Sequence, residues 1–185
     1  MTEQMPEAEV SLRLAFWLIE TKQAVGRVRV AIDGAQVATG EVLHFPLRDF
    51  MNSNGWKCSN ETNRWQGDYR SVPNDQSIEI HSRPGVGDVV AQLRGERMLR
   101  VECKKGPLIA RAGSPEYPLL RTALGHLLTL DEVNVSDIIA VAVPKTERFE
   151  TLANRWRLAP LIKRCGIHIL LVGRDNRVDG LEVAG

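Results

Sequence analysis

Three side chains capable of acid, base or metal chemistry lie in one stretch of the chain: Asp88, Glu102 and Lys104. This stretch, residues 87–106, alternates apolar and polar residues on both sides of Arg94-Gly95-Glu96. Such alternation predicts two paired strands, with the glycine at the tight position of a three-residue hairpin loop. Folding as a hairpin would bring the three side chains close together.

The apolar pattern of this hairpin selects its register. Pairing across a three-residue loop puts apolar residues on one face, as a core-packed sheet requires: Val89 opposite Val101, Ala91 opposite Leu99, and Cys103 beyond them. The other face then holds Asp88 directly opposite Glu102, with Lys104 two residues further on. A two-residue loop would send the two acids to different faces, so we expect the three-residue loop.

Two carboxylates on one sheet face repel each other, by roughly 3 kcal/mol at about 5 Å and an effective dielectric constant near 20. A hard divalent cation that takes an oxygen from each carboxylate offsets this repulsion. Lys104 is a point charge that suits a phosphate oxygen or a metal-bound water. With Mg²⁺ these groups would activate water and neutralise charge on a scissile phosphate, which is the chemistry of phosphodiester hydrolysis. The alternative is a solvated strand face on which Lys104 pairs with Glu102.

Asp88, followed after 13 residues by Glu102-Cys103-Lys104, resembles the motif of the PD-(D/E)XK nuclease superfamily. The resemblance covers residues 45–172 and implies a restriction-endonuclease-like fold, an α/β sandwich whose mixed central sheet is flanked by helices. It implies that Asp88, Glu102 and the backbone carbonyl of Cys103 bind Mg²⁺ or Mn²⁺. It also implies that Lys104 orients or activates the attacking water. The implied activity is that of a metal-dependent endonuclease acting on DNA.

The chain departs from the family pattern at three places. Gly87 stands where a proline often precedes the first acid, which we do not expect to affect metal binding. Many members carry a further Glu on the first core helix, for which Glu41 and Asp49 are the candidates here. Many also carry a Gln on the helix after the lysine strand. His126 occupies the comparable place, where it either assists the reaction or serves packing and surface.

The rest of the sequence predicts helices and strands around this hairpin. The predicted helices are residues 9–22, 47–52, 117–130 and 147–163, the last kinked or restarted at Pro160. The predicted strands are residues 27–33, 36–43, 77–81, 88–93, 98–104, 137–143 and 167–172. We expect the three strands within residues 77–104 to form a meander. Asp33-Gly34 predicts a turn that joins the first two strands in a hairpin, and residues 59–76 a polar surface loop.

This pattern predicts two domains. Residues 1–44 would form an appendage of one helix and one hairpin, and we take this appendage as the candidate contact of a homodimer. Residues 45–185 would form the PD-(D/E)XK nuclease-like domain.

Aromatic and basic residues outside the motif are candidates for contacts with nucleic acid. Trp56 and Trp65 flank the predicted loop and could stack on a base, although tryptophans that anchor an edge of the core are more common. Basic residues that could hold phosphates follow the motif or lie on the last helix: Lys105, Arg111, Arg121, Arg155, Arg157, Lys163 and Arg164. Lys105, Arg111 and Arg121 could equally be solvated surface, and we expect the four residues on the last helix mainly to form its solvent face.

The composition is that of a soluble globular chain, with 185 residues, 43% hydrophobic and 25% charged. No apolar run suits a membrane helix, the acidic N-terminus is unlike a secretory signal, and three widely spaced cysteines argue against a disulfide scaffold or zinc ribbon. These features predict a cytoplasmic protein with no membrane partner. The net charge is +1, divided as −3 in residues 1–80 and +4 in residues 81–185. This distribution permits DNA binding without demanding it.

Two other functions stay open. The first is a non-catalytic module of the same fold that binds DNA or a partner protein. The second is an enzyme for small phosphorylated substrates. Two opposed acids beside a lysine favour the nuclease over the first, and the lack of a phosphate-cradling glycine loop in the sequence weakens the second.

Overall fold

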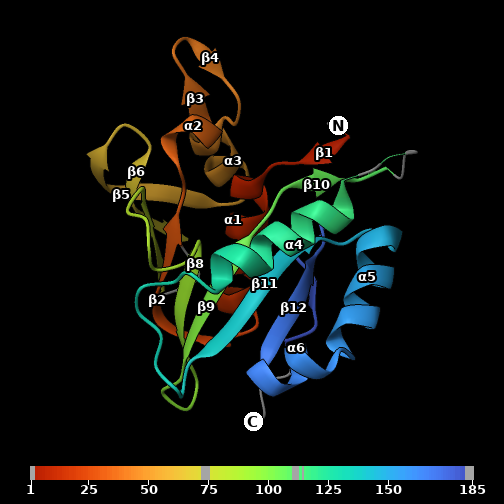
Figure 1. Ribbon diagram of the computed structural model, residues 1–185. Coiled ribbons are helices and arrows are strands. Elements are labelled where there is room, and N and C mark those ends of the chain that lie inside the picture. Colours follow the sequence, from red (N-terminus) through yellow and green to blue (C-terminus); the bar gives the residue numbers. More distant parts are fainter. Residues whose placement is uncertain (1–2, 72–75, 110–112, 114, 182–185) are drawn as a thin grey trace.

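The computed structural model describes residues 3–71, 76–109, 113 and 115–181, which form a large mixed sheet flanked by helices (Figure 1). The nine strands follow the order β13-β12-β11-β9-β8-β2-β7-β6-β5. Their bounds are β2 (Ala24–Ala31), β5 (Trp56–Asn63), β6 (Gln66–Ser71), β7 (Ser77–His81), β8 (Val89–Leu93), β9 (Met98–Cys103), β11 (Ile138–Pro144), β12 (Ile167–Val172) and β13 (Val178–Asp179). Two short ribbons stand outside this sheet: β1 (Gln4–Met5) with β10 (Gly106–Pro107), and β3 (Ala38–Thr39) with β4 (Val42–Leu43).

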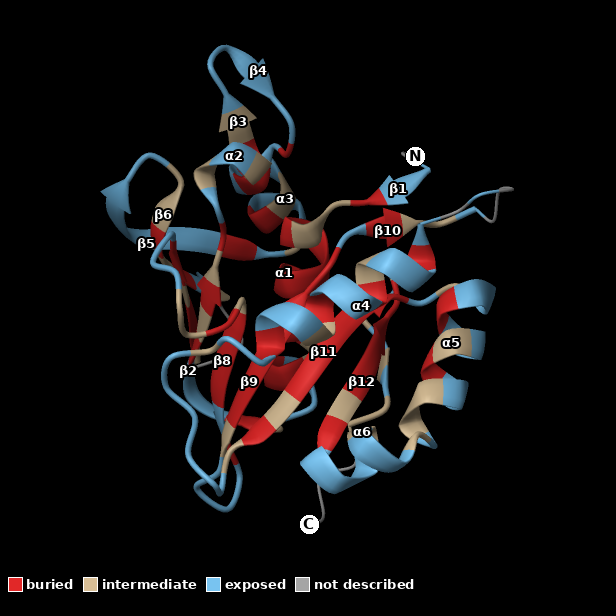
Figure 2. Ribbon diagram, in the orientation of Figure 1, coloured by how far each residue is buried: buried red, intermediate tan, exposed pale blue. Residues whose placement is uncertain are grey.

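Helices cover both faces of the sheet. They are α1 (Glu7–Glu20), α2 (Gly34–Val37), α3 (Leu47–Ser53), α4 (Glu116–Leu127), α5 (Glu147–Arg157) and α6 (Pro160–Cys165). The strand β11 shows the layering, because its residues alternate between two cores. Ala140 and Ala142 pack in the core that contains α1, whereas Val141 and Val143 pack in the core that contains α4 and α5. A strand covered on both faces is apolar throughout, as the sequence of β11 is, and Figure 2 shows that most of β11 is buried.

The helix α1 is apolar on almost all sides because the chain itself encloses it. Phe16 stacks on Phe50 of α3 and on Trp56 of β5, with ring centroids 6.0 and 5.5 Å apart. Trp56 is only 2% exposed, so it anchors the core and is not available to stack on a base. Burial within the chain accounts for the apolar character of α1 without a second copy.

The β8–β9 hairpin, on which the candidate chemistry depends, is confirmed. The predicted core-facing pairs are present: Val89 with Val101 and Ala91 with Leu99. Across the loop, the N–H of Leu93 donates to the carbonyl of Arg97 at 2.8 Å. These pairs and the side chain of Cys103 are buried in the core that contains α1, as the apolar pattern requires.

The predicted N-terminal hairpin is wrong, and so is the idea of a helix-and-hairpin appendage. β2 lies inside the sheet, parallel to β7 and antiparallel to β8, and does not pair with residues 36–43. Asp33 caps α2 by accepting the N–H of Ala35 at 3.0 Å, rather than starting a hairpin turn. Val28 and Val30 are buried in the same core as the β8–β9 hairpin. The described part of residues 1–44 therefore shares its core with the rest of the chain.

Two further predictions are corrected by the strand order. Because β2 lies between β7 and β8, residues 77–104 do not form a three-stranded meander. Most of the predicted loop at residues 59–76 belongs to the antiparallel pair β5–β6 instead. Every residue of β5 after Trp56 is exposed, and a solvent-exposed edge strand shows no apolar alternation by which to recognise it.

The predicted helices near residues 9–22, 47–52 and 117–130 are confirmed. The break at Pro160 is also confirmed: α5 ends at Arg157, and α6 begins at the proline, which is tolerated at a first helical position. Among the described residues, no helix has both the length and the apolar character needed to cross a bilayer.

Candidate active site

A cavity of about 530 Å³ opens at the edge of the sheet where β2 and β7 end, β8 begins and β9 ends. We call it the acidic cleft. Asp88, Glu102, Lys104 and His126 all line it. The structure thus brings together the four side chains that the sequence singled out, from the residue before β8, the end of β9 with the residue after it, and α4.

Backbone geometry fixes Asp88 at the mouth of the β8–β9 hairpin. Its N–H donates to the carbonyl of Val101 at 2.8 Å, and its Oδ2 accepts the N–H of Cys103 at 2.7 Å. The preceding Gly87 has a φ of +98°, and a Cβ there would lie 3.3 Å from the carbonyl oxygen of Val101. A proline, with φ near −65°, could not adopt this conformation. This explains why a glycine, and not a proline, precedes Asp88.

The two acids of the motif are difficult to ionise together. Burial, with a further contribution from the charge of Glu102, raises the pKa of Asp88 to about 7. Burial also raises the pKa of Glu102, although Lys104 opposes that shift. With a pKa of about 7, Asp88 is not fully ionised at neutral pH even with Lys104 nearby, so a further positive charge would favour its ionised form.

A third carboxylate, Glu7, enters the cleft from the first turn of α1. Its Oε1 lies 3.2 Å from Nζ of Lys104 and accepts a hydrogen bond from Nε2 of Gln36 at 3.0 Å. Of the two acids considered for this role, Glu41 is exposed between β3 and β4, and Asp49 lines a different pocket. Neither reaches the cleft.

Sequence reasoning missed both Glu7 and Gln36. The available signal for Glu7 was its place in the first turn of a buried helix, where a glutamate near the helix N-terminus is unremarkable on electrostatic grounds. Gln36 was hidden by the prediction of a strand where α2 forms.

Lys104 is only 8% exposed, and its ion-pair partner is Glu7. The alternative from the sequence was a solvated strand face on which Lys104 pairs with Glu102. Burial alone would lower the pKa of its ammonium group. The charges of Glu7, Asp88 and Glu102 more than offset that effect, and the pKa of Lys104 lies above its usual value. Lys104 is therefore a permanent cation at neutral pH.

His126 lies near the C-terminal end of α4, with Nδ1 3.8 Å from Oε2 of Glu102. Its side chain is 57% exposed, so it borders the cleft from the solvent side. The side chain of Cys103 points into the core, and burial raises the pKa of its thiol well above the usual value. Only the backbone of Cys103 can serve the cleft, and its carbonyl as a metal ligand stays a prediction.

The donor set of the cleft suits a hard divalent cation. Glu7, Asp88 and Glu102 offer carboxylate oxygens, the ligands that Mg²⁺ and Mn²⁺ prefer. Within the described ranges, no three His, Cys, Asp or Glu side chains already converge as a complete metal cluster. Instead Glu7 is turned towards Lys104, and Asp88 towards the N–H of Cys103. Binding a cation would require these carboxylates to share their oxygens between the ion and their present partners.

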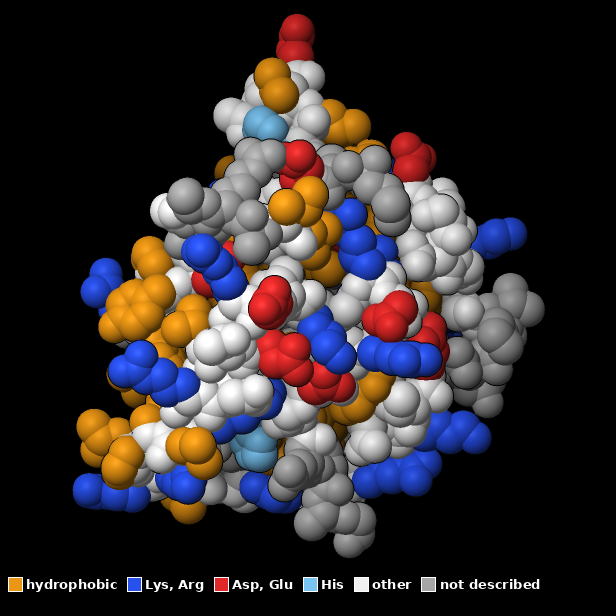
Figure 3. All heavy atoms as spheres, turned by 90° about the vertical axis from the view of Figure 1, so that its right-hand side faces the viewer, with side chains coloured by type: hydrophobic (Ala, Val, Ile, Leu, Met, Phe, Trp, Pro, Cys, Tyr) orange, Lys and Arg blue, Asp and Glu red, His pale blue; other side chains and the backbone are white. Residues whose placement is uncertain are grey.

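The basic residues considered for phosphate contacts differ in their surroundings. Lys105 and Arg121 are exposed, and Arg111 lies outside the described residues. Arg157 folds back and donates from Nε to the carbonyl of Ile169 at 3.2 Å, which is a structural role. The face that carries α5 shows acidic and basic side chains interspersed (Figure 3), which gives no continuous basic track there.

No family model, curated protein or solved structure matches the chain. The fold that the structure establishes is a mixed α/β arrangement with a large mixed sheet flanked by helices. The function is therefore inferred from the residues of the cleft.

Proposed function

We propose that the protein is a metal-dependent endonuclease that hydrolyses phosphodiester bonds of DNA, built on a restriction-endonuclease-like fold. The observation that carries this proposal is the convergence of three carboxylates and one lysine in a single cleft. Glu7 lies on α1, Asp88 directly precedes β8, Glu102 lies on β9, and Lys104 directly follows β9. The raised pKa values of Asp88 and Glu102 mark a site where buried negative charge is not fully compensated.

Glu7, Asp88 and Glu102 would hold Mg²⁺ or Mn²⁺, with the Cys103 carbonyl as a further oxygen. A bound ion of this kind lowers the pKa of a water molecule and neutralises charge on a phosphate. The raised pKa of Lys104 makes it a poor base, so its role is to hold the attacking water or a phosphate oxygen by its positive charge. Glu7 and Gln36 keep that ammonium group and its carboxylate partner in place.

The alternative is a non-catalytic module of this fold that binds DNA or a partner protein. Burying Asp88 and Glu102 in one cleft costs folding free energy, because burial and nearby negative charge oppose their ionisation. A binding module gains nothing from that cost, whereas a metal-dependent hydrolase requires it. This is why we favour the enzyme.

The test is cleavage of linear duplex, nicked, branched and single-stranded DNA in Mg²⁺ or Mn²⁺. Wild type is compared with Glu102→Gln and Lys104→Ala, and with Glu96→Gln as the matched control, because Glu96 is an exposed glutamate in the β8–β9 loop. We expect both cleft substitutions to lower the rate at least about 100-fold and the control to leave it unchanged. Cleavage that survives both substitutions, or a wild type that binds DNA but never cuts it, would reject the enzyme.

A further inference from the structure

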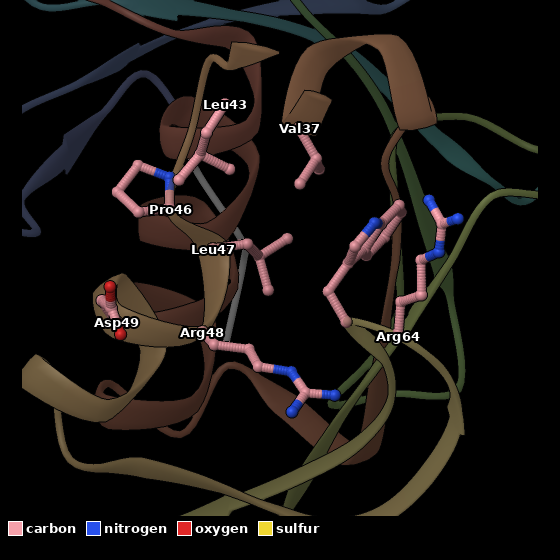
Figure 4. Close-up of a pocket in the computed structure, with 8 residues that line it drawn as sticks. Val37, Leu43, Pro46, Leu47, Arg48, Asp49 and Arg64 are labelled. Carbon is pink, nitrogen blue, oxygen red and sulfur yellow. The ribbon is translucent and has the colours of Figure 1, made fainter. Parts of the chain in front are cut away.

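A second pocket, of about 270 Å³, lies between α2, β4, α3 and the β5–β6 turn. Its walls are apolar: Val37, Leu43, Pro46, Leu47 and Trp65. Figure 4 shows Val37, Leu43 and Leu47 directed towards the same space, with Arg48 and Arg64 at its margin and Asp49 turned away. The pocket therefore combines an apolar interior, one aromatic wall and a cationic rim.

This apolar pocket and the acidic cleft share one wall. The wall is α2, a helix of four residues. Gln36 lines the acidic cleft and donates to Glu7, and the next residue, Val37, lines the apolar pocket. A ligand that follows the surface over α2 would meet both sites.

The rim of the pocket is held in place by specific contacts. Arg48 forms an ion pair with Glu61, Nη2 to Oε1 at 2.5 Å. The Tyr69 hydroxyl donates to the carbonyl of Trp65 at 2.7 Å, which anchors the turn between β5 and β6. At this turn Arg64 has a φ of +51°, a left-handed backbone that costs about 1 kcal/mol or more for a residue other than glycine.

Arg64 keeps its positive charge available. Within the part of the chain that the structure describes, no ion pair to Arg64 is found. A guanidinium group at the rim of an aromatic-walled pocket suits a nucleotide, because the base can stack on the ring while the adjacent phosphate contacts the cation. An apolar protein side chain would fit the walls but would leave Arg64 unmatched.

We propose that the apolar pocket binds one unpaired nucleobase of the strand whose backbone enters the acidic cleft. Trp65 stacks on the base, and Arg64 contacts the neighbouring phosphate. A base within an intact duplex cannot enter, because it would first have to leave its stack. The inference rests on the proposed function for the path of the strand, and it names the substrate class: single strands, or duplexes with an unpaired or displaced nucleotide.

The experiment measures binding by fluorescence anisotropy without divalent metal. The probes are a labelled single strand, the same strand carrying consecutive abasic sites, and the fully paired duplex. The variants are Trp65→Ala and Leu43→Glu, with Arg94→Ala as the control. Arg94 is an exposed arginine in the β8–β9 loop, at the end of the hairpin away from the cleft. Leu43 is 61% exposed, so Leu43→Glu tests the pocket even if Trp65→Ala unfolds.

We expect the normal single strand to bind at least about 10-fold more tightly than the abasic strand or the duplex. Trp65→Ala and Leu43→Glu should each weaken single-strand binding about 10-fold and abolish the difference between the normal and abasic strands. The control should bind as wild type does. Unchanged discrimination in both pocket variants, or preference for the duplex, would overturn the inference.

Sedimentation of the same proteins tests a competing occupant. If wild type is a dimer and Leu43→Glu a monomer, the pocket holds a second copy and the inference fails. The proposed function fails separately: a wild type that discriminates between the strands but never cuts would keep the pocket and lose the nuclease. If wild type cuts DNA and Trp65→Ala still discriminates between the normal and abasic strands, the proposed nuclease function stands and the nucleobase pocket is rejected.

Discussion

Two buried polar clusters lie along β9, and they differ in how well their charges are matched. Near one end, Nε of Arg100 lies 2.8 Å from Oδ2 of Asp137, and that oxygen also accepts the N–H of Asn134. Burial alone would raise the pKa of Asp137, but these partners more than offset it, and the pKa lies below the usual value. Two residues further along the strand, Glu102 lies in a cluster in which its own pKa and that of Asp88 are raised.

The contrast separates a structural ion pair from a candidate active site. Arg100 and Asp137 balance each other, with side chains only 7% and 2% exposed. In the acidic cleft Glu7, Asp88 and Glu102 share one buried cation, Lys104, while Arg83 at the lining is paired with Glu79. Under the proposed function, a bound divalent cation completes this cluster. Burial is common to both clusters, and the charge balance is what differs. Unmatched buried charge is the better indicator of function.

Breaking the matched pair should have the largest effect on stability. Arg100→Met leaves Asp137 buried without its cation, which should lower the free energy of unfolding by about 3–5 kcal/mol. Arg94→Met, at an exposed arginine, should change it by less than about 0.5 kcal/mol. Urea unfolding measures both. Equal stability of the two variants would remove the distinction between the clusters.

In the acidic cleft, removing a charge should increase the free energy of unfolding, and only at high pH. Between the ordinary carboxyl pKa near 4 and the value of about 7 for Asp88, the folded metal-free protein binds more protons than the unfolded chain. Its free energy of unfolding therefore falls as pH rises through this window. Asp88→Asn cannot ionise, so it should be more stable than wild type by about 1–3 kcal/mol at pH 8.

The same comparison at pH 4 supplies the control for that prediction. Asp88 is then protonated in the folded protein, so the gain from the asparagine should disappear. Thermal melting in EDTA at both pH values measures the difference. A variant that is less stable than wild type at pH 8 would mean that Asp88 is already compensated without metal.

Substituting Gln36 should have the smallest effect, confined to the Mg²⁺ dependence of cleavage. It donates to the same Oε1 of Glu7 that faces Lys104, so Gln36→Leu should loosen Glu7 without removing any charge. We expect the Mg²⁺ concentration for half-maximal cleavage to rise about 3- to 10-fold, which corresponds to the loss of one hydrogen bond of ordinary net strength, about 0.5–1.5 kcal/mol. The maximal rate should be nearly unchanged, and Gln36→Glu should not restore metal affinity. A fall in maximal rate at unchanged Mg²⁺ dependence would contradict this positioning role.

The β8–β9 hairpin was predictable because its information is local. Its strands are joined by a short loop and carry apolar residues at every second position, so the register and the grouping of Asp88, Glu102 and Lys104 follow from neighbouring residues. The break before α6 was predictable for the same reason, since a proline acts on its own helix.

The missed features depend on contacts between distant parts of the chain. β2 enters the sheet between β7 and β8, although nothing near residues 24–31 distinguishes this place from a local hairpin. Glu7 contacts Lys104 across 97 positions of sequence. Gln36 reaches Glu7 only because α2 forms beside the cleft. The third carboxylate could be recognised only once the packing of α1 was known.

The measurement that tests the account most directly is calorimetric titration of wild type with Mn²⁺ at pH 7.5, beside Glu7→Gln and Asp137→Asn. If the unmatched cluster exists for a cation, wild type binds Mn²⁺ and Glu7→Gln binds it at least about 10-fold more weakly, while Asp137→Asn, at the matched cluster, binds it as wild type does. A wild type that binds no metal, or equal affinity in wild type and Glu7→Gln, would contradict the claim that the acidic cleft is a metal-dependent active site.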